Sequence, residues 1–449
     1  MAEGGRWPLP LLAAAAALAV ATPAYARDPE ALVRAIRDTD VAAARAAIRG
    51  RGDANARLAF GATPLGIAVD TQNPAMVAML LTQGADPQRA DGDGVTPLAL
   101  ACELGDGGIV AQLLDARADV RSAGPEGITP LAICAAHAPA AVVARMLAAG
   151  AAADAVDDRG QTPLMWAAAA GRTEAMALLL TAGAAVNRGS KAGFTPLFFA
   201  IKSGVPAATE ALLAAGADPT HRGPEETSAA QLALYQHNPA AAALVIARGA
   251  DLTARDRNGN QLLHAAAAEG DPALIALLLA KGADPNGLTG ASRITWVTEA
   301  NFGVPPPPVP PTPPLLVAAA HGRAEAMTLL LAAGADPHFV AADGTNVVLA
   351  AANGGSAAAM AVALEAAPAV DVADARGRTA LHRLLGAGMP PDMAATMRLL
   401  AARGARTDIA DRSGHTAAAI ADTGLTDVKT LFHQVFAEPT PIRLAAARR

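Results

Sequence analysis

Residues 157–187 read DDRGQTPLMWAAAAGRTEAMALLLTAGAAVN, which predicts a turn followed by two short helices. Thr162 can cap a helix that begins with Pro163, because a proline at the first helical position lacks only an N–H that has no intrahelical partner. Gly171 is expected to end this helix, and Gly183 to end the next. The second helix has five residues on its expected buried side: Ala175, Met176, Leu178, Leu179 and Leu180.

The capping threonine recurs with a strict period of 33 residues, each time followed by Pro and Leu: Thr63, Thr96, Thr129, Thr162 and Thr195. A fixed period of this length is typical of repeat arrays, in which each unit buries its apolar face against its neighbours. Weaker copies open at six further positions: Thr227, Gln261, Pro313, Thr345, Thr379 and Thr416. We therefore predict twelve repeats, including a cap at each end.

This pattern resembles the ankyrin repeat, whose motif runs from Gly-x-Thr-Pro-Leu-His through two alanines, a glycine and three leucines to Gly-Ala-Asp. The resemblance implies an all-α fold, an α-solenoid of about twelve helix-turn-helix repeats with short hairpin or loop projections. It also implies a binding scaffold rather than a catalyst. His264 and His382 occupy the histidine position of the motif, where the family uses the ring as a structural hydrogen-bonding group.

Both ends of the array have the polar outer face that a terminal repeat needs. Residues 31–50 form two amphipathic segments without the Thr-Pro-Leu signal, and we expect their arginines to be exposed: Arg34, Arg37, Arg45 and Arg49. At the other end, five apolar residues share one helical face: Leu425, Val428, Leu431, Phe432 and Val435. Three polar residues of that segment point away from this face: Lys429, His433 and Gln434.

The predicted organisation has five parts: a signal peptide at 1–26, repeats 1–7 with the N-terminal cap at 27–285, a proline-rich insert at 286–312, repeats 8–12 with the C-terminal cap at 313–437, and a flexible tail at 438–449. The insert follows from the 52 residues between Gln261 and Pro313, about 19 more than the period. It contains Trp296, Phe302 and the run VPPPPVPPTPP, which favours polyproline II. It is either a spacer or flap over the array, or a docking segment for an aromatic-lined groove of a partner.

The first 26 residues have the pattern of a secretory signal. Arg6 precedes an apolar run from Leu9 to Ala21, which is shorter than the roughly 20 residues that span a bilayer. Ala24-Tyr25-Ala26 matches a cleavage site, so we expect a mature chain that starts at Arg27, is exported and has no membrane insertion after cleavage. An uncleaved anchor is the alternative. Richness in alanine and arginine, without an Asn-x-Ser/Thr acceptor, favours the bacterial periplasm.

Composition and charge narrow the class of partner. Hydrophobic residues make up 52% of the chain and aromatic residues 3%, which suits thin, closely packed helices. The formal charge of −6, from 35 basic and 41 acidic residues, argues against nucleic acid and anionic membranes as partners, since both need a basic face. We expect a monomer that binds one or more protein partners.

The two cysteines, Cys102 and Cys134, fall near equivalent positions of adjacent repeats. We expect small buried residues there rather than a disulfide. Neighbouring helices lie about 8–10 Å apart axis to axis, whereas a disulfide needs Cα atoms within about 7 Å.

No motif predicts catalysis, a cofactor or a metal. The nine histidines lack metal-ligand spacing, and the calcium-like start at Asp91-Gly92-Asp93-Gly94 has Cys102 where a loop glutamate belongs. Gly-x-Ser-x-Gly and phosphate-loop motifs are missing. The carboxylate pairs Asp157-Asp158 and Glu225-Glu226 are interpreted as solvated loop tips.

The resemblance implies that partners touch the loop tips before each threonine and the end of each first helix. The tip candidates are Asp93, Val95, Glu126, Ile128, Asp158, Arg159, Lys191 and Phe194. The first-helix candidates are Glu103, His137, Lys202 and Tyr235. We expect Val95, Ile128 and Phe194 to be exposed apolar groups among charges, as protein interfaces favour, and Trp166 and Phe199 to be core residues.

The predicted function is non-catalytic protein binding after export, on the concave face and loop tips of the array. One alternative is an immunity or inhibitor protein that blocks a single toxin or enzyme. Another is a hydrolase built on the insert, for which the insert offers Ser292, Arg293 and Glu299. A third is a spacer with no fixed ligand.

Overall fold

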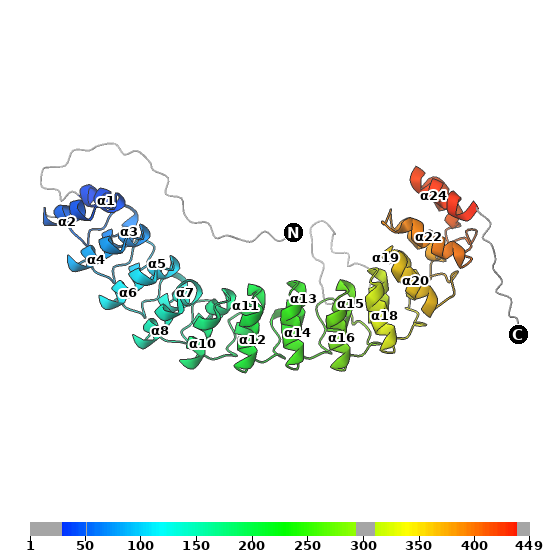
Figure 1. Cartoon of the computed structure of the whole chain (residues 1–449), viewed down its shortest axis with the longest axis horizontal. Coiled ribbons are helices and arrows are strands. Elements are labelled where there is room, and N and C mark those ends of the chain that lie inside the picture. The colour runs from blue at the N-terminus through cyan, green and yellow to red at the C-terminus, as the bar shows by residue number, and fades with distance from the viewer. Residues whose placement is uncertain (1–28, 51, 293–309, 438–449) are drawn as a thin grey trace. The chain divides into compact units, whose positions relative to one another are not determined.

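The computed structural model describes residues 29–50, 52–292 and 310–437. The predicted signal peptide, Trp296, Phe302 and the tail lie outside these residues. The described residues form 24 α-helices, α1 to α24, and three short 3₁₀ helices: η1 Ala59–Gly61, η2 Pro125–Gly127 and η3 Pro224–Glu226. Their only β-structure is two isolated bridges, Arg222 with Ser228 and Ala410 with Thr416. The fold is therefore an all-α solenoid of twelve helix pairs, as predicted (Figure 1).

The chain divides into two compact units, of which the first covers residues 1–119. Its helices are α1 Pro29–Arg37, α2 Val41–Arg49, α3 Pro64–Asp70, α4 Pro74–Thr82, α5 Pro97–Glu103 and α6 Gly107–Asp115. The first helices of successive repeats pack together, α1 on α3 and α3 on α5. The second helices do the same, α2 on α4 and α4 on α6, so three helix pairs share a continuous core.

The second unit covers residues 120–449 and continues the pattern. Its first helices are α7 Pro130–His137, α9 Pro163–Ala169, α11 Pro196–Ser203, α13 Ala229–Tyr235, α15 Leu262–Glu269, α17 Pro314–Ala320, α19 Val347–Gly354, α21 Ala380–Gly386 and α23 Ala417–Thr423. Its second helices are α8 Ala140–Ala148, α10 Thr173–Thr181, α12 Pro206–Ala214, α14 Pro239–Ala247, α16 Pro272–Ala280, α18 Ala324–Ala332, α20 Ala357–Ala366, α22 Met393–Ala402 and α24 Thr426–Ala437. Each helix packs on its counterpart in the next repeat, and Figure 1 shows α11, α13 and α15 in one row and α12, α14 and α16 in another.

A capping side chain starts most first helices. The Thr162 hydroxyl accepts a hydrogen bond from the Met165 amide at 3.3 Å, and Thr63, Thr96 and Thr129 cap their helices in the same way. Such a bond satisfies one of the amides that a helix N-terminus leaves without a partner. Thr195 also precedes a helix, but its buried hydroxyl has no hydrogen-bond partner among the described residues.

Two predicted helix starts were wrong by one residue. Ser228, not Thr227, caps α13, and Asn346, not Thr345, caps α19. The prediction assumed that a threonine caps each first helix, whereas other short polar side chains can also accept the capping hydrogen bond. With these corrections the period of 33 holds from Thr195 through Ser228 to Gln261, and again from Pro313 to Asn346.

The core is narrower than predicted. Ala175, Met176 and Leu179 of α10 are buried, but Leu178 and Leu180 are half-buried because they lie at the margins of the apolar stripe. Trp166 and Phe199, expected in the core, are also half-buried. The residue before each of them, Met165 and Phe198, is fully buried instead. The third residue after the cap therefore points into the core, and the fourth lies at its edge.

The two caps follow the prediction in most positions. All four arginines of the first repeat are exposed. In α24, Val428 and Phe432 are buried, whereas Leu431 and Val435 are half-buried. Leu425 is 63% exposed, contrary to expectation, because it precedes the helix. Within the described residues, no helix combines the length and the apolar character needed to span a membrane.

The prediction of free cysteines was wrong. Cys102 and Cys134 are both disulfide-bonded, and both are fully buried. The error lies in using the distance between helix axes. An α-helix carries its Cα atoms about 2.3 Å from its axis, so residues on facing sides of two helices are several ångströms closer than the axes. Such positions fall within the Cα separation of a disulfide.

The array continues across the insert. The Asn286 side chain donates to the Gly334 carbonyl at 2.9 Å and accepts from the Asp336 amide at 2.8 Å. Asn187 makes the same two contacts with Gly216 and Asp218. The sequence separations are 48 and 50 for Asn286 but 29 and 31 for Asn187, a difference of 19 residues in each case. Repeat 9, formed by α17 and α18, therefore stacks on repeat 8, formed by α15 and α16, as other neighbours do. Among the described residues, eight helix pairs precede the insert and four follow it.

Candidate functional site

In five repeats an aspartate at the tip accepts hydrogen bonds from backbone amides of the same tip, and three of these aspartates are buried: Asp157, Asp256 and Asp374. Asp157 is 7% exposed, and its Oδ1 accepts from the amides of Arg159 and Gln161 at 2.9 and 2.8 Å. Its Oδ2 accepts from the Trp166 indole N–H at 3.4 Å. Four other aspartates accept tip amides in the same way: Asp91, Asp256, Asp374 and Asp411. The interpretation of Asp157 as a solvated carboxylate was therefore wrong, whereas Glu225 and Glu226 are exposed as expected.

Neighbouring tips of the second unit are joined through their backbones. The Asp158 amide donates to the Glu126 carbonyl at 2.8 Å, and the Lys191 amide donates to the Arg159 carbonyl at 2.9 Å. Gly160 makes this approach possible, because it has a φ of +73° and a Cβ there would lie 2.9 Å from the Lys191 nitrogen. The tips of repeats 4 to 6 thus form a ladder with a fixed spacing.

Four predicted tip residues present charges on this ladder. Asp158 and Lys191 are exposed. The Arg159 guanidinium contacts the Glu126 carboxylate at 2.8 Å, and the two side chains are 51% and 53% exposed. An ion pair as exposed as this contributes only about 0–1 kcal/mol to stability. These four side chains are therefore available to a partner.

The apolar tip residues are less exposed than predicted. Val95, Ile128 and Phe194 are all half-buried. The Phe194 ring lies 5.8 Å from the Phe198 ring and 6.3 Å from the Phe199 ring, centroid to centroid. Phe194 precedes the cap and Phe199 is the fourth helical residue, which are the positions of a hydrophobic staple. Phe194 and Phe199 thus fix the direction in which the chain enters α11, and only the remaining surface of Phe194 can contact a partner.

The first-helix candidates lie at or near the ends of their helices. Glu103, His137 and Lys202 are exposed. Tyr235 is 44% exposed, and its hydroxyl donates to the buried carboxylate of Asp256 in the next repeat. Burial and this carboxylate raise the pKa of Tyr235 far above its usual value. The phenol is thereby neutral, and its hydroxyl is held in place by Asp256.

The structure brings together only some of the predicted residues. Asp93, Val95 and Glu103 belong to the first unit, and the other nine candidates to the second. Within the second unit, Glu126, Asp158, Arg159 and Lys191 are adjacent on the tip ladder. His137, Lys202 and Tyr235 lie on three separate first helices, α7, α11 and α13.

Sequence reasoning missed three ion pairs that link successive repeats. Arg188 contacts Asp154 at 2.6 Å, Arg222 contacts Asp251 at 2.6 Å, and Arg257 contacts Glu225 at 3.6 Å. The paired residues are 34, 29 and 32 positions apart, close to the period. A search for opposite charges about one period apart would have found them.

The histidines of the motif have the predicted structural role. His264 is 1% exposed; its Nδ1 accepts from the Gln261 amide at 3.3 Å, and its Nε2 contacts the Thr312 carbonyl at 3.0 Å. Because Nδ1 accepts, the proton resides on Nε2 and donates to Thr312. His382 uses its Nδ1 toward Thr379 and its Nε2 toward the His415 carbonyl. Each ring joins one repeat to the next.

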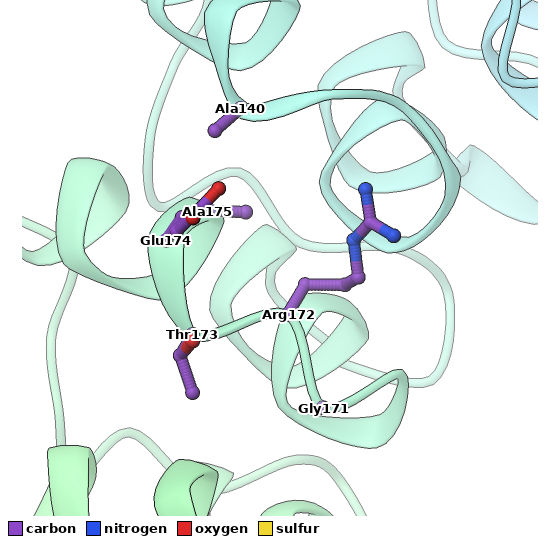
Figure 2. Close-up of a pocket in the computed structure, with 6 residues that line it drawn as sticks. All are labelled: Ala140, Gly171, Arg172, Thr173, Glu174 and Ala175. Atoms are coloured by element: carbon purple, nitrogen blue, oxygen red, sulfur yellow. The ribbon is translucent and has the colours of Figure 1, made fainter.

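An open hollow of about 250 Å³ lies where α10 begins (Figure 2). It is lined by Ala140, Gly171, Arg172, Thr173, Glu174 and Ala175, none of which is a predicted site residue. Arg172 extends away from Glu174 in Figure 2 and donates to the Ala138 carbonyl at 2.7 Å. Among the described residues, no group of three or more His, Cys, Asp and Glu side chains could hold a metal ion.

The stacked helix pairs and joined tips define a helical repeat protein. Residues 32–124 and 131–223 match the family model for ankyrin repeats in three copies, and residues 258–289 match the model for a single ankyrin repeat. The matched segments are thus similar to ankyrin repeats. Such repeats generally mediate protein–protein interactions, and proteins made of them are generally non-catalytic scaffolds.

One similar solved structure is described as the "Crystal structure of the ankyrin repeat domain of Bcl-3: a unique member of the IkappaB protein family". It is 27% identical to this chain, with a TM-score of 0.39, and the match covers 45% of this chain and 92% of that chain. No curated protein matches the chain.

Proposed function

We propose that this protein is a non-catalytic scaffold that binds a protein partner on the tip ladder of repeats 4 to 6. The observation that carries the proposal is the pair of backbone hydrogen bonds that joins Glu126 to Asp158 and Arg159 to Lys191. They hold four exposed charged side chains at a fixed spacing. Surfaces fixed before binding lose less conformational entropy on association, so more of the contact energy appears as affinity.

Tyr235 extends the proposed surface with an aromatic group. Its ring is partly exposed, while its hydroxyl is held by Asp256. Tyrosine is enriched among residues that dominate binding energy, because it offers a large contact area with few rotatable bonds. Lys202 on α11 is an exposed charge at the matching end of the preceding first helix.

We also propose that the protein acts as a monomer after export, in the bacterial periplasm. The oxidised state of Cys102 and Cys134 supports this proposal. Disulfides persist in secreted and periplasmic proteins and are rare in the cytosol, where thiols are kept reduced. The signal-like pattern of residues 1–26 is an independent support from sequence.

The partner can be identified by affinity purification of the exported protein from its native host, followed by mass spectrometry. Calorimetric titration of that partner then tests the surface. Arg159→Ala with Lys191→Ala should weaken binding by more than about 2 kcal/mol, the scale of interface hot spots. The matched control is Arg45→Ala with Arg398→Ala, which removes two exposed cations from second helices and should leave the affinity unchanged.

A deletion variant distinguishes binding at the tip ladder from binding at the proline-rich insert. Removing residues 304–311 keeps Thr312, whose amide and carbonyl hydrogen-bond to Thr289 at the base of the insert. Normal binding by this variant is expected. Loss of binding here, with normal binding by the Arg159 and Lys191 variant, would assign recognition to the proline-rich segment and refute the ladder as the site.

A further inference from the structure

The tips of repeats 11 and 12 carry unpaired positive charge. Arg376 and Arg412 are exposed, and neither forms an ion pair within the described residues. Their backbones are in direct contact, because the Arg412 amide donates to the Arg376 carbonyl at 2.8 Å. Gly377 makes this contact possible: its φ is +78°, and a Cβ there would lie 3.0 Å from the Arg412 nitrogen. Two guanidinium groups are thus held on adjacent tips.

The buried carboxylate in the same repeat as Arg376, that of Asp374, already has four hydrogen-bond donors. Asp374 Oδ1 accepts from the amides of Arg376 and Arg378 at 2.8 and 2.9 Å. Its Oδ2 accepts from the Arg378 and Arg383 guanidinium groups at 2.9 and 3.0 Å. The carboxylate is 2% exposed, as is expected of a buried charge that is paired and hydrogen-bonded. Because one carboxylate pairs with two guanidinium groups, the group of three side chains has a net charge of +1. The Arg378 side chain is 40% exposed.

The ladder of repeats 4 to 6 shows that another arrangement was available. There the Arg159 guanidinium meets Glu126 of the neighbouring tip at 2.8 Å. Arg376 occupies the same position of its repeat, three residues before the capping threonine, and Asp343 on the preceding tip is the counterpart of Glu126. No ion pair joins Arg376 to Asp343 within the part of the chain that the structure describes, and the following tip carries Arg412. Arg376 and Arg412 carry the same charge on adjacent tips, so an anion from another molecule could accept hydrogen bonds from both guanidinium groups.

The charge distribution along the chain limits the size of that anion. Residues 374–416 contain seven arginines and four aspartates, with no lysine or glutamate, for a net charge of +3. The whole chain carries −6, so the remainder carries −9. A long polyanion or an anionic membrane would meet this acidic remainder and be repelled. A short acidic segment that contacts only these tips would not.

We propose that Arg376, Arg378 and Arg412 form a recognition surface for a short acidic peptide segment of a protein partner. Glutamate or aspartate side chains of that segment would accept hydrogen bonds from the guanidinium groups, whose planar arrangement of donors suits a carboxylate. This inference rests on the proposed protein-binding function and adds a second contact surface, at the C-terminal end of the array.

The test uses the full-length protein and a fluorescein-labelled peptide of alternating Glu and Gly. A Gln-Gly peptide of equal length is the control, and fluorescence anisotropy reports binding. The Glu peptide should bind and the Gln peptide should not. Raising the salt from about 0.01 M to about 0.15 M shortens the Debye length from about 30 Å to about 8 Å, and should weaken binding strongly.

Charge reversal locates the surface. Arg376→Glu with Arg412→Glu should lower the affinity for the Glu peptide at least about tenfold, since it removes both charge-assisted contacts. Arg45→Glu with Arg398→Glu makes the same change in net charge at exposed positions elsewhere, and should lower it less than about twofold. Should the first variant misfold by circular dichroism, Arg376→Gln with Arg412→Gln makes the same test with a smaller perturbation.

Several outcomes would overturn the inference. They are equal binding of the Gln peptide, equal losses in the two charge-reversed variants, binding of phosphatidylglycerol vesicles in place of the peptide, and self-association that depends on Arg376 and Arg412. If the peptide fails while the native partner still binds through Arg159 and Lys191, the scaffold function stands without this surface. If substitutions in neither surface weaken binding of the native partner, the proposed function fails as well.

Discussion

Single buried side chains make this array sensitive to acid. His264 lies between repeats 8 and 9, accepts from the Gln261 amide and donates to the Thr312 carbonyl. Burial lowers the pKa of His264, although hydrogen bonds to the carbonyls of Thr312 and Gly287 oppose the shift. Protonation of Nδ1 would place an N–H against the Gln261 N–H and lose that contact. The folded array therefore favours the neutral ring.

A lowered folded-state pKa fixes the direction of the pH dependence. Stability from His264 is fully present above the unfolded value of about 6.5 and is lost as the pH falls from there through the folded pKa. Denaturant unfolding at about pH 7.5 and about pH 5.5 should show lower stability at the acidic value. His264→Ala should cost about 1–3 kcal/mol at neutral pH, because the half-buried Gln261 amide and Thr312 carbonyl lose their contacts with the ring, and should reduce the pH dependence. His137→Ala, at an exposed site, should leave it intact; identical pH profiles for all three proteins would contradict the assignment.

The roles of individual side chains could be predicted only where the repeat motif assigns them. The positions of His264 and His382 follow from the motif, and so do their hydrogen bonds. The burial of Asp157 does not, because its charge suggests solvent while three hydrogen bonds from its own repeat hold it inside. The exposure of Phe194 was wrongly predicted for a related reason. An apolar residue before a cap can pack against its own helix, and that contact depends on which residue is the fourth in the helix.

Helices and tips respond to damage within their own repeat and its neighbours, because repeat arrays have only nearest-neighbour interfaces. Leu179 is fully buried, and its helix α10 packs against α8, α9 and α12. Leu179→Ala should cost about 2–5 kcal/mol, as truncation in a packed core does. Arg45→Ala, on the exposed side of α2, should cost less than about 0.5 kcal/mol. Denaturant unfolding compares the two, and equal losses would show that the repeat frame is misplaced.

The order of the helices was predictable because the apolar period and the capping threonines set it. The size of the insertion, 19 residues beyond the period, likewise follows from the distance between Gln261 and Pro313 in the sequence. The joining of the tips was not predictable. The contact between Lys191 and Arg159 is made by backbone atoms, which leave no signature in side-chain identity. The lack of an ion pair at Arg376 and Arg412, within the described residues, also needed the three-dimensional structure, because both arginines have aspartates near them in the sequence.

Across the full chain, the state of the two cysteines bears on where the protein works. Cys102 and Cys134 are oxidised and have no solvent-exposed surface. A buried disulfide is protected from small thiols as long as the array stays folded, since exchange requires attack by a thiolate on an accessible sulfur. The cytosol would reduce newly made chains before they fold, whereas the periplasm oxidises them.

The proposal of export is therefore testable through the thiols and the N-terminus together. We expect protein recovered from the periplasmic fraction to begin at Arg27 and to react with a maleimide reagent only after both reduction and denaturation. Reduction without denaturation should leave the thiols unmodified, because neither sulfur is exposed. A Cys102→Ser and Cys134→Ser variant is the control for labelling at other groups, as the chain has no further cysteine. N-terminal sequencing identifies the first residue, and intact-mass measurement shows how many maleimide groups were added to the same sample. An intact Met1 in a cytoplasmic fraction, with thiols that react before reduction, would refute both export and the oxidised state.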